Sequence, residues 1–408
     1  MSRRATVVIL ATLDTKGEEA AFLAEIFERQ GFASRLLDLG LLEPPQITPH
    51  ITRDEVARAA RSSVAELVKS SKAIAMSRMS EGAGTLLKNL HSQEGVAGVI
   101  GIGGNQGAAM ACSAMQVLPL GVPKVMVSTV VSGDIRPYIK AKDIAMFFSV
   151  GDILGGPNPI TRSVLSQAAA ALVGMMTWGE GLEIPQGPPV VAITALGNTH
   201  PAVTRCVDRL KDYGYRVVPF HASGACGSAM EELIEEGKID GVLDLTPHEL
   251  VGDVLGADIY RPVRPGRLLA AARQGIPQVI STGGLDYYCF GPEETILPHL
   301  RDRTVYMHNP LNANVMLAEE ELILLAEVMA ERLNQSKGPV KVVLPRLGWS
   351  IYGSEGGPFW NPQGMAIFTE RLKAALEPKV EVLELDAHIN NPAFADTCAN
   401  LLHTMLQE

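Results

Sequence analysis

The stretch Gly95–Ala111, GVAGVIGIGGNQGAAMA, decides the fold class of this chain. An apolar run from Val96 to Ile102 meets a glycine-rich turn, and small helix-forming residues follow from Ala108. This order predicts a buried strand, a tight turn and the start of a helix. Such a junction directs free backbone N–H groups and the positive end of a helix dipole toward one place, which suits a phosphate. The stretch therefore predicts an α/β protein that binds a nucleotide.

Length, charge and cysteine usage narrow the class of protein. With 408 residues the chain is too long for one typical hydrophobic core, so two domains are expected. The formal net charge of −10 argues against broad binding to nucleic acid or to an anionic membrane. No apolar run reaches the roughly 18 to 20 residues of a membrane-spanning helix. Five scattered cysteines, without a C-x-x-C pair, favour a reducing, cytoplasmic location and no cysteine-based metal site.

Two βαβ patterns open the two halves of the chain. In each, a buried strand is followed by a helix that ends at a glycine and then by a second strand. The first comprises strand 6–11, helix 18–30 and strand 34–39, and the second comprises strand 190–195, helix 202–213 and strand 215–220. Strands that alternate with helices predict parallel sheets with right-handed crossovers.

Weaker matches continue in the same order along both halves. Segment 95–101 matches 238–244, segment 121–127 matches 275–281, and segment 142–147 matches 302–307. Segments 142–147 and 302–307 each lead to an Asn-Pro pair, after which a long helix is expected. The predicted fold class is α/β, with two Rossmann-like doubly wound halves and mainly parallel sheets, related as a divergent internal repeat. A proline- and glycine-rich linker, 183–189, separates an N-terminal nucleotide-binding domain (1–183) from a C-terminal domain (190–408).

A phosphate-binding site is expected in the N-terminal half, because ligands of doubly wound sheets lie outside the carboxyl ends of the strands. We expect Lys16 and Arg78 to neutralise phosphate charge, and Asp14 to bind ribose hydroxyls or Mg²⁺ through water. The alternative for Asp14 and Lys16 is a surface turn or a helix cap. The candidate cofactor-binding residues are Thr12, Asp14, Thr15, Lys16, Arg78 (after an expected strand at 73–76), Gly103, Gly104, Asn105, Gln106, Gly107, Ser128 and Thr129.

A second pocket is expected in the C-terminal half, where polar residues follow several strands. Acidic side chains and histidines in one place suit general acid–base work. The candidate catalytic residues are His221, Glu231, Asp244, Glu249 and His308. Taken singly, each is a weak signal, and a lone histidine after a strand is more often a packed or capping residue. No ligand spacing of a recognised metal site occurs, so no protein-bound metal is predicted, and Ser223 lacks the glycine of a nucleophile elbow. The glycine- and aromatic-rich segment 348–360 is a candidate lid or a packed loop.

Five of these motifs together resemble a family known for the N-terminal inhibitory domain of a plant tobamovirus-resistance protein, a Tm-one-like ATP-binding domain. The motifs are segments 11–18, 101–107, 220–231, 244–246 and 308–310. The resemblance implies two Rossmann-like subdomains, ATP in the N-terminal one, a homodimer, and a nucleotide site formed by Asp14, Thr15, Lys16 and Gly103–Gly107. Asn105 and Ala108 stand where Ser and Thr are expected. The antiviral role does not carry over, since it needs a surface for one viral protein.

Three functions stay open on the sequence. The first is an ATP-binding metabolic enzyme that uses the C-terminal pocket on a small-molecule substrate. The second is a non-catalytic, nucleotide-dependent regulatory or interaction module. The third is a sugar-nucleotide transferase, suggested only by the glycine turn, whose GGNQGA core resembles the phosphate-facing loops of some glycosyltransferases. ATP binding is the molecular prediction that the first two functions share.

Overall fold

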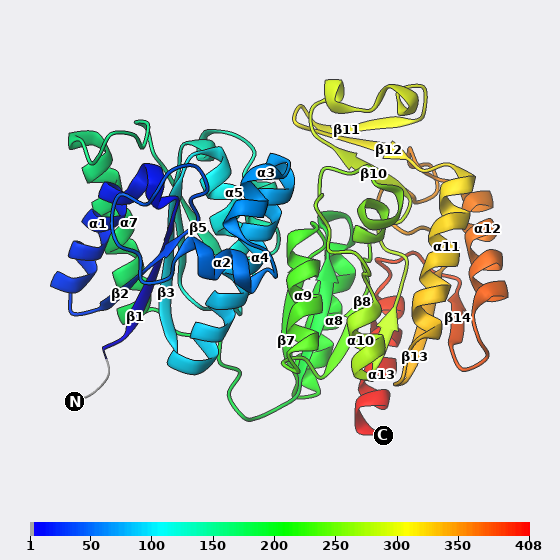
Figure 1. Cartoon of the computed structure of the whole chain (residues 1–408). Coiled ribbons are helices and arrows are strands. Elements are labelled where there is room, and N and C mark those ends of the chain that lie inside the picture. Colours follow the sequence, from blue (N-terminus) through cyan, green and yellow to red (C-terminus); the bar gives the residue numbers. More distant parts are fainter. Residues whose placement is uncertain (1–3) are drawn as a thin grey trace. The chain divides into compact units, whose positions relative to one another are not determined.

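The computed structural model describes residues 4–408, and its internal contacts divide the chain into two compact units that meet between Glu183 and Ile184 (Figure 1). This division falls in the proline- and glycine-rich segment that the sequence marks as a linker. Among the helices described, none is long and apolar enough to cross a bilayer.

The N-terminal unit alternates strands and helices as a doubly wound fold requires. Its elements are β1 (Thr6–Ala11), α1 (Leu13–Arg29), β2 (Ala33–Asp38), α2 (Arg53–Ala59), α3 (Val64–Lys69), α4 (Lys72–Glu94), β3 (Val96–Gly103), α5 (Asn105–Met115), β4 (Lys124–Ser128), α6 (Arg136–Ile139), β5 (Ile144–Phe148) and α7 (Pro159–Trp178). The strands form one parallel sheet in the order β2-β1-β3-β4-β5.

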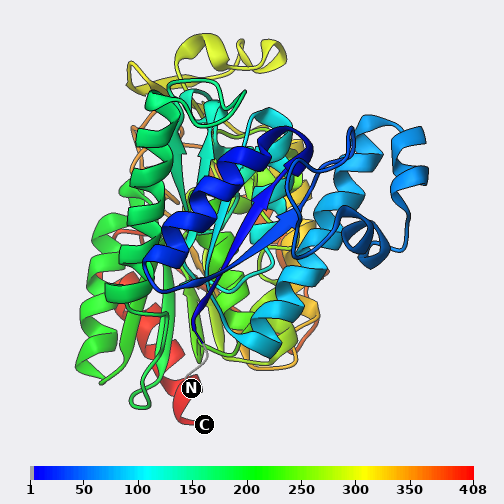
Figure 2. The same cartoon turned by 60° about the vertical axis from the view of Figure 1, so that its left-hand side comes forward.

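Helices cover both faces of this first sheet. The side chains of Val7 and Ile9 on β1 pack with α1 and α7, whereas Val8 and Leu10 pack with α4 and α5. Because neighbouring side chains of a strand point to opposite faces, a strand covered on both sides is a continuous apolar run, and the sequence TVVILA of β1 is such a run. Figure 2 shows α1 and α7 on the same face of the sheet.

The C-terminal unit contains a second parallel sheet and a small antiparallel one. Its elements are β6 (Val190–Ala195), α8 (His200–Asp212), β7 (Arg216–His221), α9 (Ala225–Glu235), β8 (Gly241–Asp244), α10 (Leu269–Gln274), β9 (Gln278–Ile280), β10 (Tyr287–Phe290), β11 (Val305–Asn309), β12 (Asn312–Met316), α11 (Glu319–Asn334), β13 (Val340–Pro345), α12 (Pro362–Ala375), β14 (Glu381–Leu385) and α13 (Pro392–Gln407). The parallel sheet has the order β14-β13-β9-β8-β6-β7, and β10-β12-β11 are antiparallel (Figure 1).

The two parallel sheets share one strand order. Reading β7-β6-β8-β9-β13 against β2-β1-β3-β4-β5 pairs the strands one for one, with β14 added at the edge of the second sheet. The α/β class with two doubly wound halves is therefore confirmed. In each sheet the order reverses beside the first strand, between β1 and β3 and between β6 and β8, which is where ligands of this fold class bind.

Two expected elements are wrong. Segment 73–76 is not a strand but part of α4, because its Ala75 belongs to a buried stripe that continues through Met79, Ala83 and Leu87 at helical spacing. Segment 302–307 contributes to β11, which pairs antiparallel with β12 instead of joining the parallel sheet. The counterpart of β5 is β13.

The two Asn-Pro pairs also differ. Asn158 caps α7 by accepting hydrogen bonds from the backbone N–H groups of Ile160 and Thr161. Asn309 instead accepts from the N–H of Leu311 within the turn between β11 and β12, and the next helix starts only at Glu319. An Asn-Pro pair suits both a helix start and a tight turn, so the pair alone did not distinguish them.

Candidate functional site

A cavity of about 590 Å³ opens in the N-terminal unit at the carboxyl ends of β1 and β3. This is the place where the strand order of the sheet reverses. Its lining includes eight of the twelve residues predicted for the cofactor: Thr12, Asp14, Thr15, Lys16, Gly104, Asn105, Gln106 and Gly107. Two segments about ninety residues apart in the sequence therefore meet at one site.

The start of α5 offers backbone donors to this cavity. Gly104 is the residue before the helix, and it has no side chain that could cap the helix start. The first backbone N–H that bonds to the chain here is that of Ala108, which donates to the carbonyl of Gly104. The N–H groups of the first helical turn therefore have no intrahelical acceptor and can receive an anion.

The two adjacent glycines of the turn have different roles. A Cβ at Gly103 would lie 2.8 Å from the Cα of Gly107, so this glycine lets the strand end pack closely against the helix. A Cβ at Gly104 would meet no atom within 4 Å. Gly103 therefore serves packing, and Gly104 faces open space.

Asp14 holds a wall of the cavity. Its carboxylate is buried, and Oδ2 accepts hydrogen bonds from the N–H groups of Leu42 (2.9 Å) and Glu43 (3.4 Å). These contacts fix the loop after β2. The other carboxylate oxygen, Oδ1, is buried and has no hydrogen-bond partner in the described chain. The expected role of Asp14 as a ligand of ribose or Mg²⁺ stays a prediction.

Lys16 and Lys72 are the cationic side chains of the lining. Lys16 interrupts α1, with φ −128° and ψ 22°, and its Nζ lies 3.5 Å from the carbonyl of Thr15, which is at the limit of a hydrogen bond. The ammonium group thus has little to bind within the chain. Lys72, at the start of α4, was not predicted, because the sequence placed a strand there.

One side of the cavity is apolar. It is formed by Leu39, Leu41, Leu42, Leu67, Val68, Ala75, Met76 and Met110. Leu42 is 82% exposed and Val68 is 60% exposed, although both are large apolar side chains at the cavity. Apolar surface that lines a concave site with a few polar groups is typical of small-molecule binding sites.

The other four predicted cofactor residues do not line this cavity. Arg78 lies on the exposed side of α4, where its Nη1 is 2.8 Å from Oε2 of Glu81. Gly103 packs on α5, as described above. Ser128 is buried, and its hydroxyl accepts a hydrogen bond from the N–H of Val130. Thr129 begins the short helical turn that follows β4. The expected position of Arg78 at a strand end was wrong because α4 is a helix.

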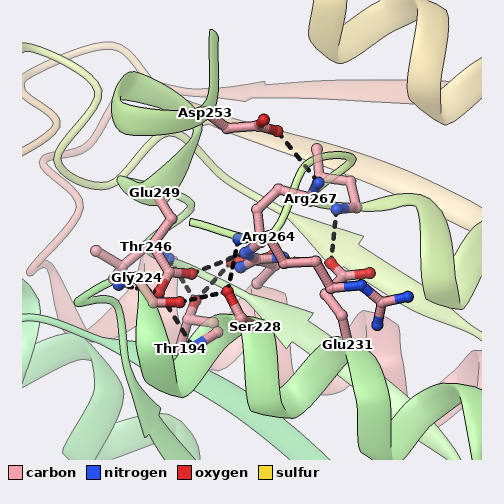
Figure 3. A network of polar contacts seen from close by, with 12 residues as sticks. Thr194, Gly224, Ser228, Glu231, Thr246, Glu249, Asp253, Arg264 and Arg267 are labelled. Carbon is pink, nitrogen blue, oxygen red and sulfur yellow. Dashed lines mark hydrogen bonds and ion pairs between the residues drawn. The ribbon is translucent and has the colours of Figure 1, made fainter. Parts of the chain in front are cut away.

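In the C-terminal unit, three of the predicted catalytic residues surround one buried arginine. Figure 3 labels two of the three, Glu231 and Glu249, together with Arg267. Arg267 donates to Oε1 of Glu231 (2.7 Å), Oδ2 of Asp244 (2.7 Å) and Oε2 of Glu249 (2.8 Å). All four side chains are at most about one-twentieth exposed. We call these four residues the Arg267 cluster.

Backbone and hydroxyl donors satisfy the remaining carboxylate oxygens of the Arg267 cluster. Glu231 accepts from the N–H groups of Leu268 and Ala270, and Asp244 accepts from the hydroxyl of Thr194. Oε1 of Glu249 accepts from the N–H groups of Gly224 and Gly227, at the start of α9. Burial raises the pKa of Glu249, while Arg267 opposes that shift.

This geometry bears on the expected acid–base pocket. Each carboxylate of the cluster bonds to donors of the chain itself and is closed to solvent, as in structural ion networks. Sequence reasoning found the three acids but missed Arg267, which lies in an irregular segment without any periodic pattern. The contacts of Glu231, Asp244 and Glu249 are those of a structural ion network, and their predicted catalytic role stays a prediction.

The two predicted catalytic histidines are apart from the cluster. His221 ends β7 and lies edge-on to Tyr260, with ring centroids 6.2 Å apart, and burial lowers its pKa. His308 is exposed on antiparallel β11, where its Nδ1 is 2.9 Å from the hydroxyl of Tyr352. Neither histidine contacts a carboxylate of the Arg267 cluster in the described chain.

The candidate lid packs on its own unit. Trp349 is 2% exposed and meets Phe368 edge-on, and Phe359 is 1% exposed. The hydroxyl of Ser350 donates to Oδ2 of buried Asp286 at 2.6 Å. The segment 348–360 is therefore a packed loop, which was the alternative considered on the sequence.

Fold and site together define a two-unit α/β protein with a ligand-sized cavity at the switch point of its first sheet. The family models of the Uncharacterised protein family (UPF0261) match it over both units, the N-terminal domain at residues 5–180 and the C-terminal domain at residues 188–406. The chain belongs to this family, and the resemblance noted in the sequence is confirmed at that level.

Relatives share most of its length. A UPF0261 protein of Clostridium tetani is 38% identical over 404 residues, which cover 98% of this chain and 99% of the relative. The ToMV resistance protein Tm-1 of Solanum lycopersicum is 36% identical over 335 residues, which cover 80% of this chain and 44% of that protein. A solved UDP-GlcNAc 2-epimerase of Methanocaldococcus jannaschii covers 98% of this chain and 92% of its own at 8% identity, with a TM-score of 0.20, which supports no inference about substrate.

Proposed function

We propose that this protein binds ATP in the cavity of its N-terminal unit. The observation that carries the proposal is the uncapped start of α5, which faces the cavity between β1 and β3. Free backbone N–H groups at a helix start, together with the helix dipole, favour the negative charge of a phosphate. In this arrangement the phosphates lie against Gly104–Gly107.

Lys16 and the apolar wall supply the remaining contacts. The ammonium of Lys16 lies on the same cavity and would neutralise part of the triphosphate charge. The apolar wall with Leu42 and Val68 would cover the flat face of a base. The cavity volume of about 590 Å³ falls within the range of about 300 to 1,000 Å³ common for small-molecule sites.

Mg²⁺, if it accompanies ATP, would be held mainly by phosphate oxygens. Asp14 is the carboxylate of the lining, and its Oδ2 already accepts two backbone N–H groups. Mg²⁺ commonly keeps several waters and binds through substrate phosphates and few carboxylates. Of the Asp14 carboxylate, only Oδ1 has no hydrogen-bond partner in the described chain, so the lining would add at most this oxygen to the phosphate ligands of Mg²⁺.

We favour a nucleotide-dependent regulatory or interaction module over an enzyme of acid–base chemistry. The carboxylates expected to perform that chemistry are tied to Arg267 and are buried. Nothing in the site favours the sugar-nucleotide transferase in particular. A cytoplasmic homodimer stays a prediction of the sequence and of the family resemblance.

Titration calorimetry with the intact protein and ATP tests the proposal. Replacing Lys16 with Met should weaken ATP binding about 10- to 100-fold, because a hydrogen bond to a charged group contributes about 1.5–3 kcal/mol. Lys88→Met is the matched control, since Lys88 is an exposed lysine of α4 outside the cavity lining. It should leave the affinity within about twofold of the unmodified protein, because distant exposed charges are screened by salt.

Two outcomes would refute ATP binding at this site. One is the absence of binding heat at millimolar ATP in folded protein. The other is an equal loss of affinity in Lys16→Met and Lys88→Met, because a general charge effect would then explain the result. Incubation of the same protein with ATP and Mg²⁺ shows in addition whether ATP is turned over.

A further inference from the structure

Three potential metal ligands meet in the C-terminal unit, outside the Arg267 cluster. His248 follows β8, Asp258 follows the helical turn Val251–Leu255, and Cys289 lies on β10. A ring nitrogen of His248, a carboxylate oxygen of Asp258 and the Sγ of Cys289 all lie within 4.8 Å of one another. The imidazole and carboxylate side chains are at most 1% exposed, and Cys289 is 7% exposed.

The orientation of His248 leaves one ring nitrogen without a donor or acceptor of ordinary geometry. Nδ1 lies 2.6 Å from the carbonyl of Gly284. A carbonyl oxygen only accepts, so Nδ1 carries the proton and donates it. Nε2 is fully buried and has no hydrogen-bond partner in the described chain, although Oδ2 of Asp258 is 3.2 Å away. Metal-bound histidines are typically oriented in this manner, with the other ring nitrogen donating to a carbonyl.

Asp258 is held in place by the backbone around Cys289. Oδ1 accepts from the N–H of Tyr260, and Oδ2 accepts from the N–H of Cys289, both at 2.8 Å. The N–H of Ile259 in turn donates to the carbonyl of Cys289 at 2.7 Å. The carboxylate and the thiol are thus fixed beside each other by contacts that do not depend on an ion.

Aromatic side chains enclose the three ligands. The rings of Tyr260 and Tyr287 lie 5.8 Å and 5.1 Å from the ring of His248.

We propose that His248, Asp258 and Cys289 form a Zn²⁺ site in the C-terminal unit, with Nε2, one carboxylate oxygen and Sγ as ligands. Nitrogen, oxygen and thiolate ligands in one set are characteristic of zinc, whereas Mg²⁺ and Ca²⁺ select oxygen. Tetrahedral zinc with bonds of about 2.0 to 2.3 Å needs ligand atoms about 3.3 to 3.8 Å apart. The observed separations within 4.8 Å require only a small approach of the side chains.

Binding of the ion requires the thiolate form of Cys289, so the thiol proton is released to solvent. Three protein ligands leave a fourth position for water or for a small anionic or carbonyl ligand. All three ligands belong to the C-terminal unit, whereas the residues of the nucleotide cavity belong to the N-terminal unit.

Cobalt titration of the metal-stripped, intact chain tests the site, because Co²⁺ replaces zinc and its bond to a thiolate absorbs in the near ultraviolet. We expect this absorption to saturate at one Co²⁺ per chain and to disappear when Zn²⁺ is added. Cys289→Ser should abolish the thiolate absorption. Cys226→Ser is the matched control, because Cys226 is an exposed free thiol and its loss should leave the absorption unchanged.

Asp258→Asn provides a second variant that keeps the side-chain shape and the thiol. It should retain the absorption but require at least tenfold more Co²⁺ to reach half saturation. Circular dichroism at each step establishes that the variants are folded. A folded unmodified chain without thiolate absorption would overturn the proposal and identify the cluster as a buried hydrogen-bonded network, and so would a Cys289→Ser variant that keeps the absorption.

Discussion

The carboxyl ends of the strands carry different structures in the two parallel sheets, although the sheets share one strand order. We call these two regions the first edge and the second edge. At the first sheet the edge opens into a cavity of about 590 Å³, with Lys16 and an uncapped helix start on its wall. At the second sheet the corresponding edge holds the Arg267 cluster, in which three carboxylates share one guanidinium group. One topology thus supports an open cavity in one unit and a closed ion network in the other.

The starts of α5 and α9 show this contrast most clearly. Glu249 places its carboxylate at the start of α9 and accepts from the N–H groups of Gly224 and Gly227. It provides from within the chain the negative charge that a helix start attracts. At the start of α5 the preceding residue is Gly104, which has no side chain to do this. We infer that a helix start can receive an external anion only where the chain has not already supplied one.

Replacement of Arg267 with Met is expected to cause the largest loss of stability among the variants that compare the two edges. It would leave three buried carboxylates without their cation, and loss of one partner of a buried ion pair already costs about 3 to 5 kcal/mol. We expect the C-terminal unit to lose at least about 4 kcal/mol of unfolding free energy, or not to fold. Urea unfolding followed by tryptophan fluorescence measures the change, since Trp349 lies in this unit.

Arg264→Met is the control for that experiment. Arg264 pairs with Glu235, but their side chains are 40% and 34% exposed. Exposed ion pairs contribute roughly 0 to 1 kcal/mol, so this variant should unfold almost like the unmodified protein. Equal losses in both variants would show that the Arg267 cluster is not a special support of the second unit.

A pH-dependent loss of stability is expected from Asp286, which is also at the second edge. Burial raises its pKa to about 6, against the lowering effect of the Ser350 hydroxyl bond. The folded state therefore holds the proton more tightly than the unfolded state. The stability that this proton supplies is complete below the ordinary carboxyl pKa of about 4 and is lost as the pH rises through about 6.

Asp286→Asn should remove this pH dependence. A shift of about two pKa units corresponds to about 3 kcal/mol, so at pH 8 the variant should be more stable than the unmodified protein by up to that amount. Near pH 4 the two proteins should differ little. Denaturant unfolding at both pH values measures the difference, and a difference that does not change with pH would contradict the account.

Smaller changes in unfolding free energy are expected from substitutions at the adjacent glycines of the first edge, Gly103 and Gly104. Gly103→Ala brings a methyl group within 2.8 Å of the Cα of Gly107, and overpacking of this kind costs about 1 to 3 kcal/mol. Gly104→Ala meets no atom within 4 Å, so its unfolding free energy should change by less than about 1 kcal/mol. Thermal unfolding of the two variants side by side measures both effects, and similar losses would place Gly104 in packed surroundings.

Much of the first unit could be predicted from its sequence. Ligands of doubly wound sheets bind outside the carboxyl ends of the strands. This rule, applied to the apolar runs and to the glycine turn after β3, located Lys16 and Gly104 correctly at one cavity. The apolar wall could not be found, because it combines the segment after β2 with residues of α3, α4 and α5. A short apolar run such as 73–76 suits a strand and a helix equally.

The second edge was harder to predict for a physical reason. Strand-end rules locate acidic residues such as Asp244 and Glu249, but they do not indicate which cation faces them. Arg267 comes from an irregular segment more than twenty residues after β8, so its contact with Asp244 depends on the folded chain. His248 and Cys289 are about forty residues apart in the sequence, and no sequence pattern predicts that their side chains lie close together.

Amide hydrogen exchange of the intact protein, with and without saturating ATP, compares the starts of α5 and α9 in one sample. We expect ATP to slow exchange at least tenfold at residues 105–107 and to leave Gly224 and Gly227 unchanged, because Glu249 already binds the latter two amides. Unchanged exchange at residues 105–107 while ATP is bound would contradict this expectation.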